Sequence, residues 1–129
     1  CATMQAMDDR LIARLVGAGR VLFGIACLVA PRQILRQWGK DASPAVLWWI
    51  RAFGIRDTVL GAGALVSLNS DQPDTTWVKA GAAADTADAV VVLLGRNELD
   101  PSFVIPTLAI AGPAAALGWK ASLGLSKRR

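Results

Sequence analysis

The chain has 129 residues, enough for a single domain, of which 53% are hydrophobic and only 19% are charged. Its mean hydropathy of +0.41 is that of a membrane protein or of an unusually apolar soluble helical bundle, and we favour the membrane protein. Histidine is absent, which excludes an imidazole-ligated haem, a typical zinc site and a Ser-His-Asp triad. The formal charge of +4 comes mainly from a basic C-terminal tail, typical of an anchor at a membrane surface; we expect no nucleic-acid partner and no cofactor.

Four apolar segments of about 17 to 24 residues are close to the roughly 20 residues that a helix needs to cross a bilayer. The predicted helices are residues 11–30, 45–68, 77–95 and 103–119. Between the first and second lies a linker, residues 31–44, whose amphipathic stretch 33–38 could lie along the membrane interface. Pro113 should kink the last helix. The expected fold is all-α, one domain over residues 1–129: a four-transmembrane-helix bundle with a short amphipathic interfacial linker.

The five tryptophans all lie in the linker or near a predicted segment end, as in the aromatic belts of membrane proteins. Four crossings would place both termini on one side of the membrane. Basic residues are slightly more frequent on that side, so we expect a bacterial inner-membrane protein with both termini in the cytoplasm.

Seven ionisable residues lie inside the predicted spans: Arg14, Arg20, Arg51, Arg56, Asp57, Asp85 and Asp88. Each costs about 2.5 to 3.5 kcal/mol at bilayer depth, so they should face a protein interior or a wet cavity. Helical spacing places Asp85 and Asp88 on one face of the third segment, with Arg51, Arg20 or Arg14 as expected partners. Asp57 is then a third partner or an intrahelical neighbour of Arg51, whereas Arg56 should point to roughly the opposite side.

The pair Asp85 and Asp88 has two interpretations. Two carboxylates on one helix face could act as acid and base in catalysis. Alternatively, they neutralise two arginines and hold the bundle together, which we favour for so small a chain. The pair could also bind a hard cation, but two carboxylates do not complete a metal site, and none is predicted.

Short motifs resemble those of a family of small bacterial four-helix membrane proteins of unknown function. They are Arg51-Ala52-Phe53-Gly54-Ile55-Arg56-Asp57 followed by Gly61; Gly17-Ala18-Gly19-Arg20, Gly24 and Ala30-Pro31-Arg32; and Asp85-Thr86-Ala87-Asp88. The resemblance covers about residues 11 to 119 and implies four spans and a shared importance for Arg51, Arg56, Asp57, Asp85 and Asp88. It supplies no activity. The amphipathic linker and the two prolines of the last segment are not matched to it.

Three functions follow as hypotheses. The first is an accessory or lipophilic-ligand-binding membrane protein whose Arg/Asp cluster holds the bundle together or accepts a polar headgroup. The second is a membrane-embedded cyclase, isomerase or hydrolase, in which Asp85 or Asp88 transfers protons and Arg20 or Arg51 stabilises negative charge. The third is a small proton-coupled transporter. The expected partners are membrane lipid, a lipophilic small molecule, and a second copy of the chain or a larger membrane complex.

Overall fold

The computed structural model describes residues 2–37, 43–70 and 74–127. Within these ranges every regular element is an α-helix, as predicted. The helices are α1 (Ala2–Val29), α2 (Pro31–Gln37), α3 (Pro44–Ser67), α4 (Thr76–Leu94) and α5 (Pro101–Ser126).

Local sequence explains where two of the long helices begin. Ser43 caps α3 by accepting a hydrogen bond from the Val46 amide at 3.4 Å, and Pro44 occupies the first helical position, where its missing N–H costs nothing. In the same way Asp100 accepts from the Ser102 amide at 2.9 Å ahead of Pro101. Both helices therefore start at a cap followed by proline.

The predicted bounds of the first and last helices were wrong. The first helix begins at Ala2 rather than at residue 11. The last helix runs over Pro101–Ser126 rather than residues 103–119, because it begins at the Asp100 cap and continues beyond Trp119. The first half of the predicted linker forms α2, whose Leu35 is 3% exposed and which contacts α1 and α3. The end of the predicted amphipathic stretch, at Trp38, lies outside the described residues.

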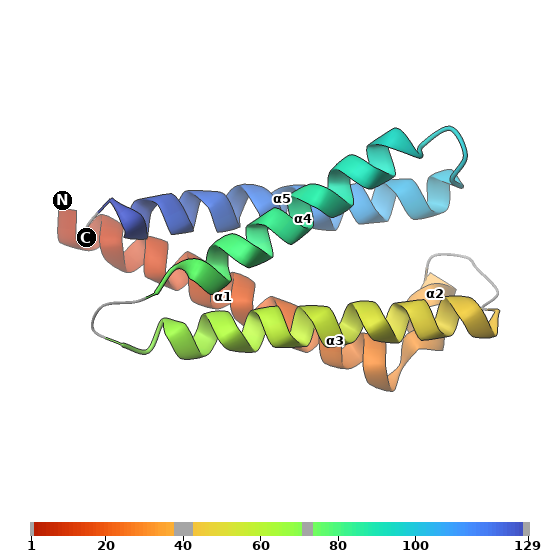
Figure 1. The fold of residues 1–129 in the computed structure, drawn as a ribbon, viewed down its shortest axis with the longest axis horizontal. Helices are drawn as coiled ribbons and strands as arrows, with labels where there is room; N and C mark the ends of the chain where they lie inside the picture. The colour runs from red at the N-terminus through yellow and green to blue at the C-terminus, as the bar shows by residue number, and fades with distance from the viewer. Residues whose placement is uncertain (1, 38–42, 71–73, 128–129) are drawn as a thin grey trace.

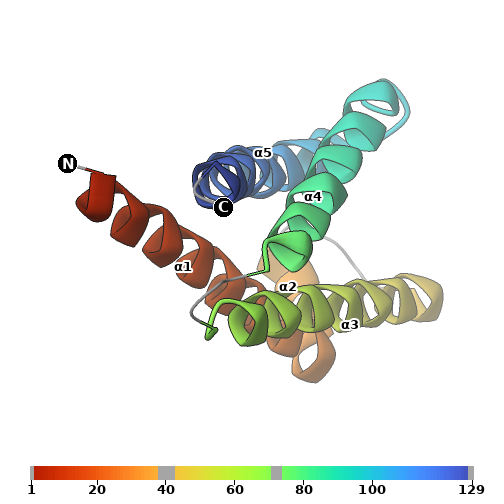
Figure 2. The ribbon, with the colours of Figure 1, turned by 60° about the vertical axis from the view of Figure 1, so that its left-hand side comes forward.

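The four long helices form two pairs. α1 packs mainly against α3, and α4 mainly against α5, with fewer contacts between the pairs. Figure 1 shows both termini at one end of the bundle, where the pairs are close together. Towards α2 and the α4–α5 loop the pairs diverge, which is also visible in the rotated view (Figures 1 and 2). The bundle is therefore closed near its termini and open at the other end.

Glycine allows the close approach of α1 and α3. A Cβ atom added to Gly54 would lie 2.7 Å from the Gly24 carbonyl oxygen and 2.8 Å from the Cys27 Cβ atom. At Gly17 an added Cβ would lie 3.3 Å from the Gly61 carbonyl oxygen. Small residues at a helix–helix contact are typical of membrane bundles, where backbones approach closely.

Several ionisable side chains are buried beside a small hydrophobic core, while many large apolar side chains are exposed. Arg20, Asp57 and Asp85 are 6–7% exposed, whereas Val29 and Leu94 are 80% and 81% exposed. Large exposed apolar side chains occur on all four long helices. Exposed apolar surface of this kind is found where a protein contacts another protein or a membrane.

Two helices are long and apolar enough to cross a membrane, Asp8–Val29 within α1 and Pro101–Ser126. Buried core helices of soluble proteins and signal sequences can meet the same criterion, although here only 28% and 17% of the apolar windows are buried. α3 and α4 do not meet it, because each carries three charged residues within its span. The predicted four crossings are thus supported for two helices.

Candidate functional site

Arg20 joins three helices at the centre of the bundle. From α1, its Nη1 atom donates to Asp57 Oδ1 of α3 at 2.9 Å. Its Nη2 atom donates to the Gly81 carbonyl oxygen of α4 at 2.7 Å and to Asp85 Oδ2, also of α4. Gly81 leaves room for the guanidinium, since an added Cβ would lie 3.2 Å from Arg20 Nε. The predicted pairing of Arg20 with an aspartate of the third segment is confirmed.

Arg56 forms the second half of an Arg–Asp cluster, which consists of Arg20, Arg56, Asp57, Asp85 and Asp88. Its Nη1 and Nη2 atoms pair with Asp88 Oδ1 and Oδ2 at 3.0 and 2.5 Å, a bidentate arrangement that fits the planar guanidinium. Nη2 also lies 3.6 Å from Asp57 Oδ1. The guanidinium carbon sits 4.3 Å from the centroid of the Phe53 ring, a cation–π contact.

The sequence placed Arg56 on the wrong side of its helix. Adjacent residues differ by about 100° around a helix, so Arg56 starts at the flank of the face that carries Asp57. Its long side chain then reaches round to Asp88 and Asp57. The position of a Cα atom around the helix therefore does not show which side an arginine contacts, because its side chain is long enough to reach a neighbouring face.

Two of the seven charged residues lie outside the cluster, contrary to the prediction. Arg14 is exposed and donates to the Leu68 carbonyl oxygen at 3.4 Å and to Asn69 Oδ1 at 3.2 Å. Arg51 lies with its guanidinium carbon 5.3 Å from the Trp48 ring centroid. Each is six residues, or about 9 Å along the helix axis, from the level of the cluster. Neither therefore pairs with Asp57, Asp85 or Asp88 in the described structure.

Arg10 is a structural residue that the sequence analysis missed. Its Nε and Nη2 atoms donate to the Leu68 carbonyl oxygen, and Nη2 donates to the Ser70 carbonyl oxygen at 2.6 Å. The free carbonyls at the end of a helix attract cations, so Arg10 ties α1 to the end of α3. In the sequence, the only indication of this role is that Arg10 is a basic residue directly before an apolar segment.

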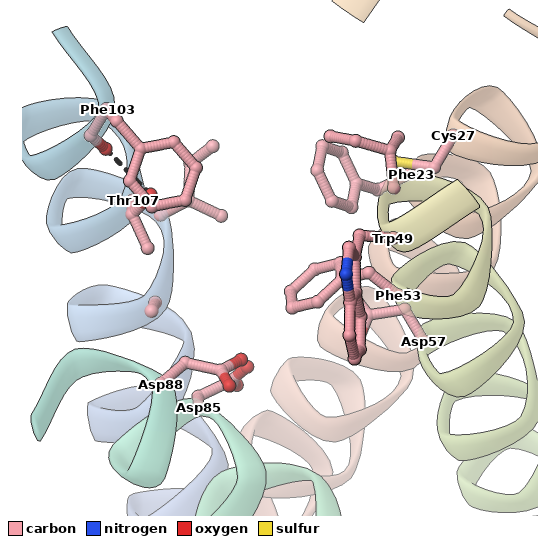
Figure 3. Close-up of a pocket in the computed structure, with 12 residues that line it drawn as sticks. Phe23, Cys27, Trp49, Phe53, Asp57, Asp85, Asp88, Phe103 and Thr107 are labelled. Atoms are coloured by element: carbon pink, nitrogen blue, oxygen red, sulfur yellow. Dashed lines mark hydrogen bonds between the residues drawn. The ribbon is translucent and has the colours of Figure 1, made fainter. Parts of the chain in front are cut away.

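A half-open cavity of about 180 Å³ lies beside the cluster, between the two helix pairs (Figure 3). Its walls are mainly aromatic and aliphatic, with Phe103 from α5 on one side and aromatic residues of α1 and α3 on the other. The full set is Phe23, Cys27, Trp49, Ile50, Phe53, Asp57, Asp85, Asp88, Phe103, Thr107, Ile110 and Ala111. Phe23 and Phe53 meet edge to face with centroids 6.3 Å apart, which fixes one wall.

The charged side chains that line the cavity are all aspartates: Asp57, Asp85 and Asp88. Arg20 and Arg56 bind these carboxylates but are not among the lining residues. With all five groups ionised, the cluster has two positive and three negative charges, a net charge of −1. The cavity therefore has apolar walls and one end that is lined by carboxylates.

The sequence identified the aspartates but not the aromatic walls. Phe23, Trp49, Phe53 and Phe103 lie on three helices, and no spacing motif connects them. Among the described residues there is no group of three or more His, Cys, Asp or Glu side chains that could hold a metal ion. The chemistry the site offers is thus hydrogen bonding and charge next to an apolar surface.

Comparison with known proteins finds no protein-family model that matches the chain, and searches of curated proteins and of solved structures find no match. The resemblance to small four-helix membrane proteins stays a prediction from short motifs.

Proposed function

We propose that this chain is a four-span integral membrane protein that binds a lipophilic small molecule in the cavity between its two helix pairs. Its expected location is the bacterial inner membrane, with both termini in the cytoplasm. The cavity would then open towards the extracytoplasmic half of the bilayer, because it lies at the end of the bundle opposite the termini.

The buried ion pairs support membrane insertion of α3 and α4. The charges that make these helices poor spans by composition include Arg56, Asp57, Asp85 and Asp88, and these four pair within the bundle. Intramembrane charges are tolerated where they pair in a protein interior. The exposed surfaces of the same helices carry large apolar side chains such as Val59 and Leu94, suited to contact with lipid tails.

The observation that carries the binding proposal is the cavity itself. An apolar cavity of about 150 Å³ is large enough to bind benzene, so about 180 Å³ suits one ring with a small substituent. Ligand sites in proteins are characteristically concave and apolar with a few polar groups. Here the polar groups are the carboxylates at one end.

The contacts favour binding over acid–base catalysis. Each of the three carboxylates accepts a hydrogen bond from an arginine, so none stands ready as a general base. The arginines are likewise engaged and do not line the cavity, where they would have to stabilise negative charge on a substrate. Catalysis and proton-coupled transport are weaker candidates on this geometry.

Filling the cavity tests the proposal. Ala111 lines the cavity and is 6% exposed, whereas Ala109 on the same helix is exposed. Wild type, Ala111→Phe and Ala109→Phe would be purified in detergent, and organic extracts of each compared by untargeted mass spectrometry. We expect a lipophilic species enriched with wild type and Ala109→Phe and lost from Ala111→Phe. Equal recovery of every species from all three proteins would contradict the proposal.

A further inference from the structure

We propose that the ligand is a lipophilic organic monocation, with an apolar body of about one ring against the aromatic walls and an ammonium-type headgroup at the end of the cavity lined by Asp57, Asp85 and Asp88. This inference rests on the proposed binding function and specifies its ligand class. It follows from three features of the cavity: the sign of its lining charges, the net charge of the cluster to which they belong and the aromatic character of its walls.

The first feature is the sign of the charges that a ligand would meet. The lining contains the three aspartates, and the two arginines that pair with them are not among the lining residues. Asp88 is the most accessible of the three, with 22% of its side chain exposed against 8% and 9% for Asp57 and Asp85. A ligand entering the cavity therefore meets carboxylate oxygen, which attracts a cation and repels an anion.

The second feature is the imbalance of the cluster. With all five groups ionised, two arginines face three aspartates, and the cluster carries one excess negative charge. Arg51 and Arg14, the other arginines predicted to lie within the spans, are engaged with Trp48 and with Leu68 and Asn69. An uncompensated charge inside a bilayer is costly. A bound monocation would neutralise the site, whereas a dication would reverse the imbalance.

The third feature is the aromatic wall. Rings attract cations through their negatively charged faces, and recognition of quaternary ammonium groups by aromatic residues is a common use of this contact. The wall already accommodates one cation, since the Arg56 guanidinium lies over the Phe53 ring. Phe23, Trp49 and Phe103 provide further aromatic surface along the cavity.

Three probes of matched size separate charge from shape. Benzyltrimethylammonium is the cation, neopentylbenzene its neutral isostere and benzylsulfonate an anion of similar size. Binding would be measured by equilibrium dialysis with protein in phosphatidylcholine nanodiscs, against empty nanodiscs, so that partition into lipid is subtracted. We expect the cation to bind about tenfold more tightly than the neutral isostere, and the anion more weakly than either.

Charge variants make the test specific. Asp88→Asn brings the cluster to a net charge of zero and should abolish the preference for the cation while binding of neopentylbenzene persists. Arg56→Gln brings it to −2 and should strengthen the preference. The double variant Arg56→Gln/Asp88→Asn removes a complete ion pair, keeps the net charge at −1 and should retain the preference. The double variant also serves if either single variant fails to fold.

The outcomes distinguish the two proposals. If neopentylbenzene binds as tightly as the cation and Ala111→Phe removes both, the cavity binds lipophilic molecules and the inference about charge is overturned. If no probe binds to wild type above empty nanodiscs and organic extracts show no species lost in Ala111→Phe, the proposed function itself fails. A preference for the cation that is unchanged in Asp88→Asn would also overturn the inference.

Discussion

Replacing Arg20 by methionine removes a side chain that joins α1, α3 and α4. Arg20 donates hydrogen bonds to Asp57, Asp85 and the Gly81 carbonyl oxygen, and it is 7% exposed. Hydrogen bonds from a charged donor contribute about 1.5 to 3 kcal/mol each, a gross loss of about 4.5 to 9 kcal/mol for three. Part is recovered because Arg56 stays near Asp57. We therefore expect a net loss of about 3 to 5 kcal/mol in the free energy of unfolding, the range for breaking a buried ion pair.

The reason for this loss is the charge that remains, so removing the acids should restore stability. The variant Arg20→Met/Asp57→Asn/Asp85→Asn also removes the two carboxylates that pair with Arg20, so no unpaired charge remains there. At least half of the lost free energy of unfolding should return. Arg51→Met is the matched control, because Arg51 contacts the Trp48 ring and lies outside the cluster; it should cost only about 0.5 to 1 kcal/mol.

Unfolding would be followed by far-ultraviolet circular dichroism as dodecylmaltoside micelles are titrated with dodecyl sulfate. The expected order of stability is wild type, then Arg51→Met, then the triple variant, with Arg20→Met the least stable. If Arg20→Met loses no more stability than Arg51→Met, Arg20 does not hold the three helices together.

Two further predictions concern packing and topology. Gly54→Ala should lower the free energy of unfolding by about 1 to 3 kcal/mol, because the added methyl group would meet Gly24 and Cys27 at under 3 Å. Gly19→Ala, with nothing within 4 Å of the added Cβ, should instead raise it by up to about 1 kcal/mol through helix propensity, and the same micelle titration shows whether the signs differ. For topology, cysteines introduced as Glu98→Cys and Lys127→Cys in a cysteine-free background should react with a membrane-impermeant maleimide in intact cells only at position 98. Labelling of both positions from the same side would contradict four crossings.

The Arg–Asp cluster shows how far the sequence led to the site. Charge inside apolar segments has to be buried and neutralised, so the residue types alone indicated a polar centre with Asp85 and Asp88 in it. The choice among Arg14, Arg20 and Arg51 as partners depends on the axial offset of one helix against another. Arg20 is level with Asp57 and Asp85, while Arg14 and Arg51 are not. Helical geometry gives each residue's angle and height on its own helix, but it does not give the axial offset between two helices.

The apolar helices, the glycine contacts and the need for a buried polar centre were determined by the sequence, because hydrophobicity and helical spacing act within one segment. The ends of α5 depended on local context as well, since α5 begins at the Asp100 cap and ends at the Lys127 cap. The cavity was decided only by the tertiary structure. The two helix pairs are in contact near the termini and diverge towards the other end, where they form the cavity. Its lining side chains come from four helices and share no sequence pattern.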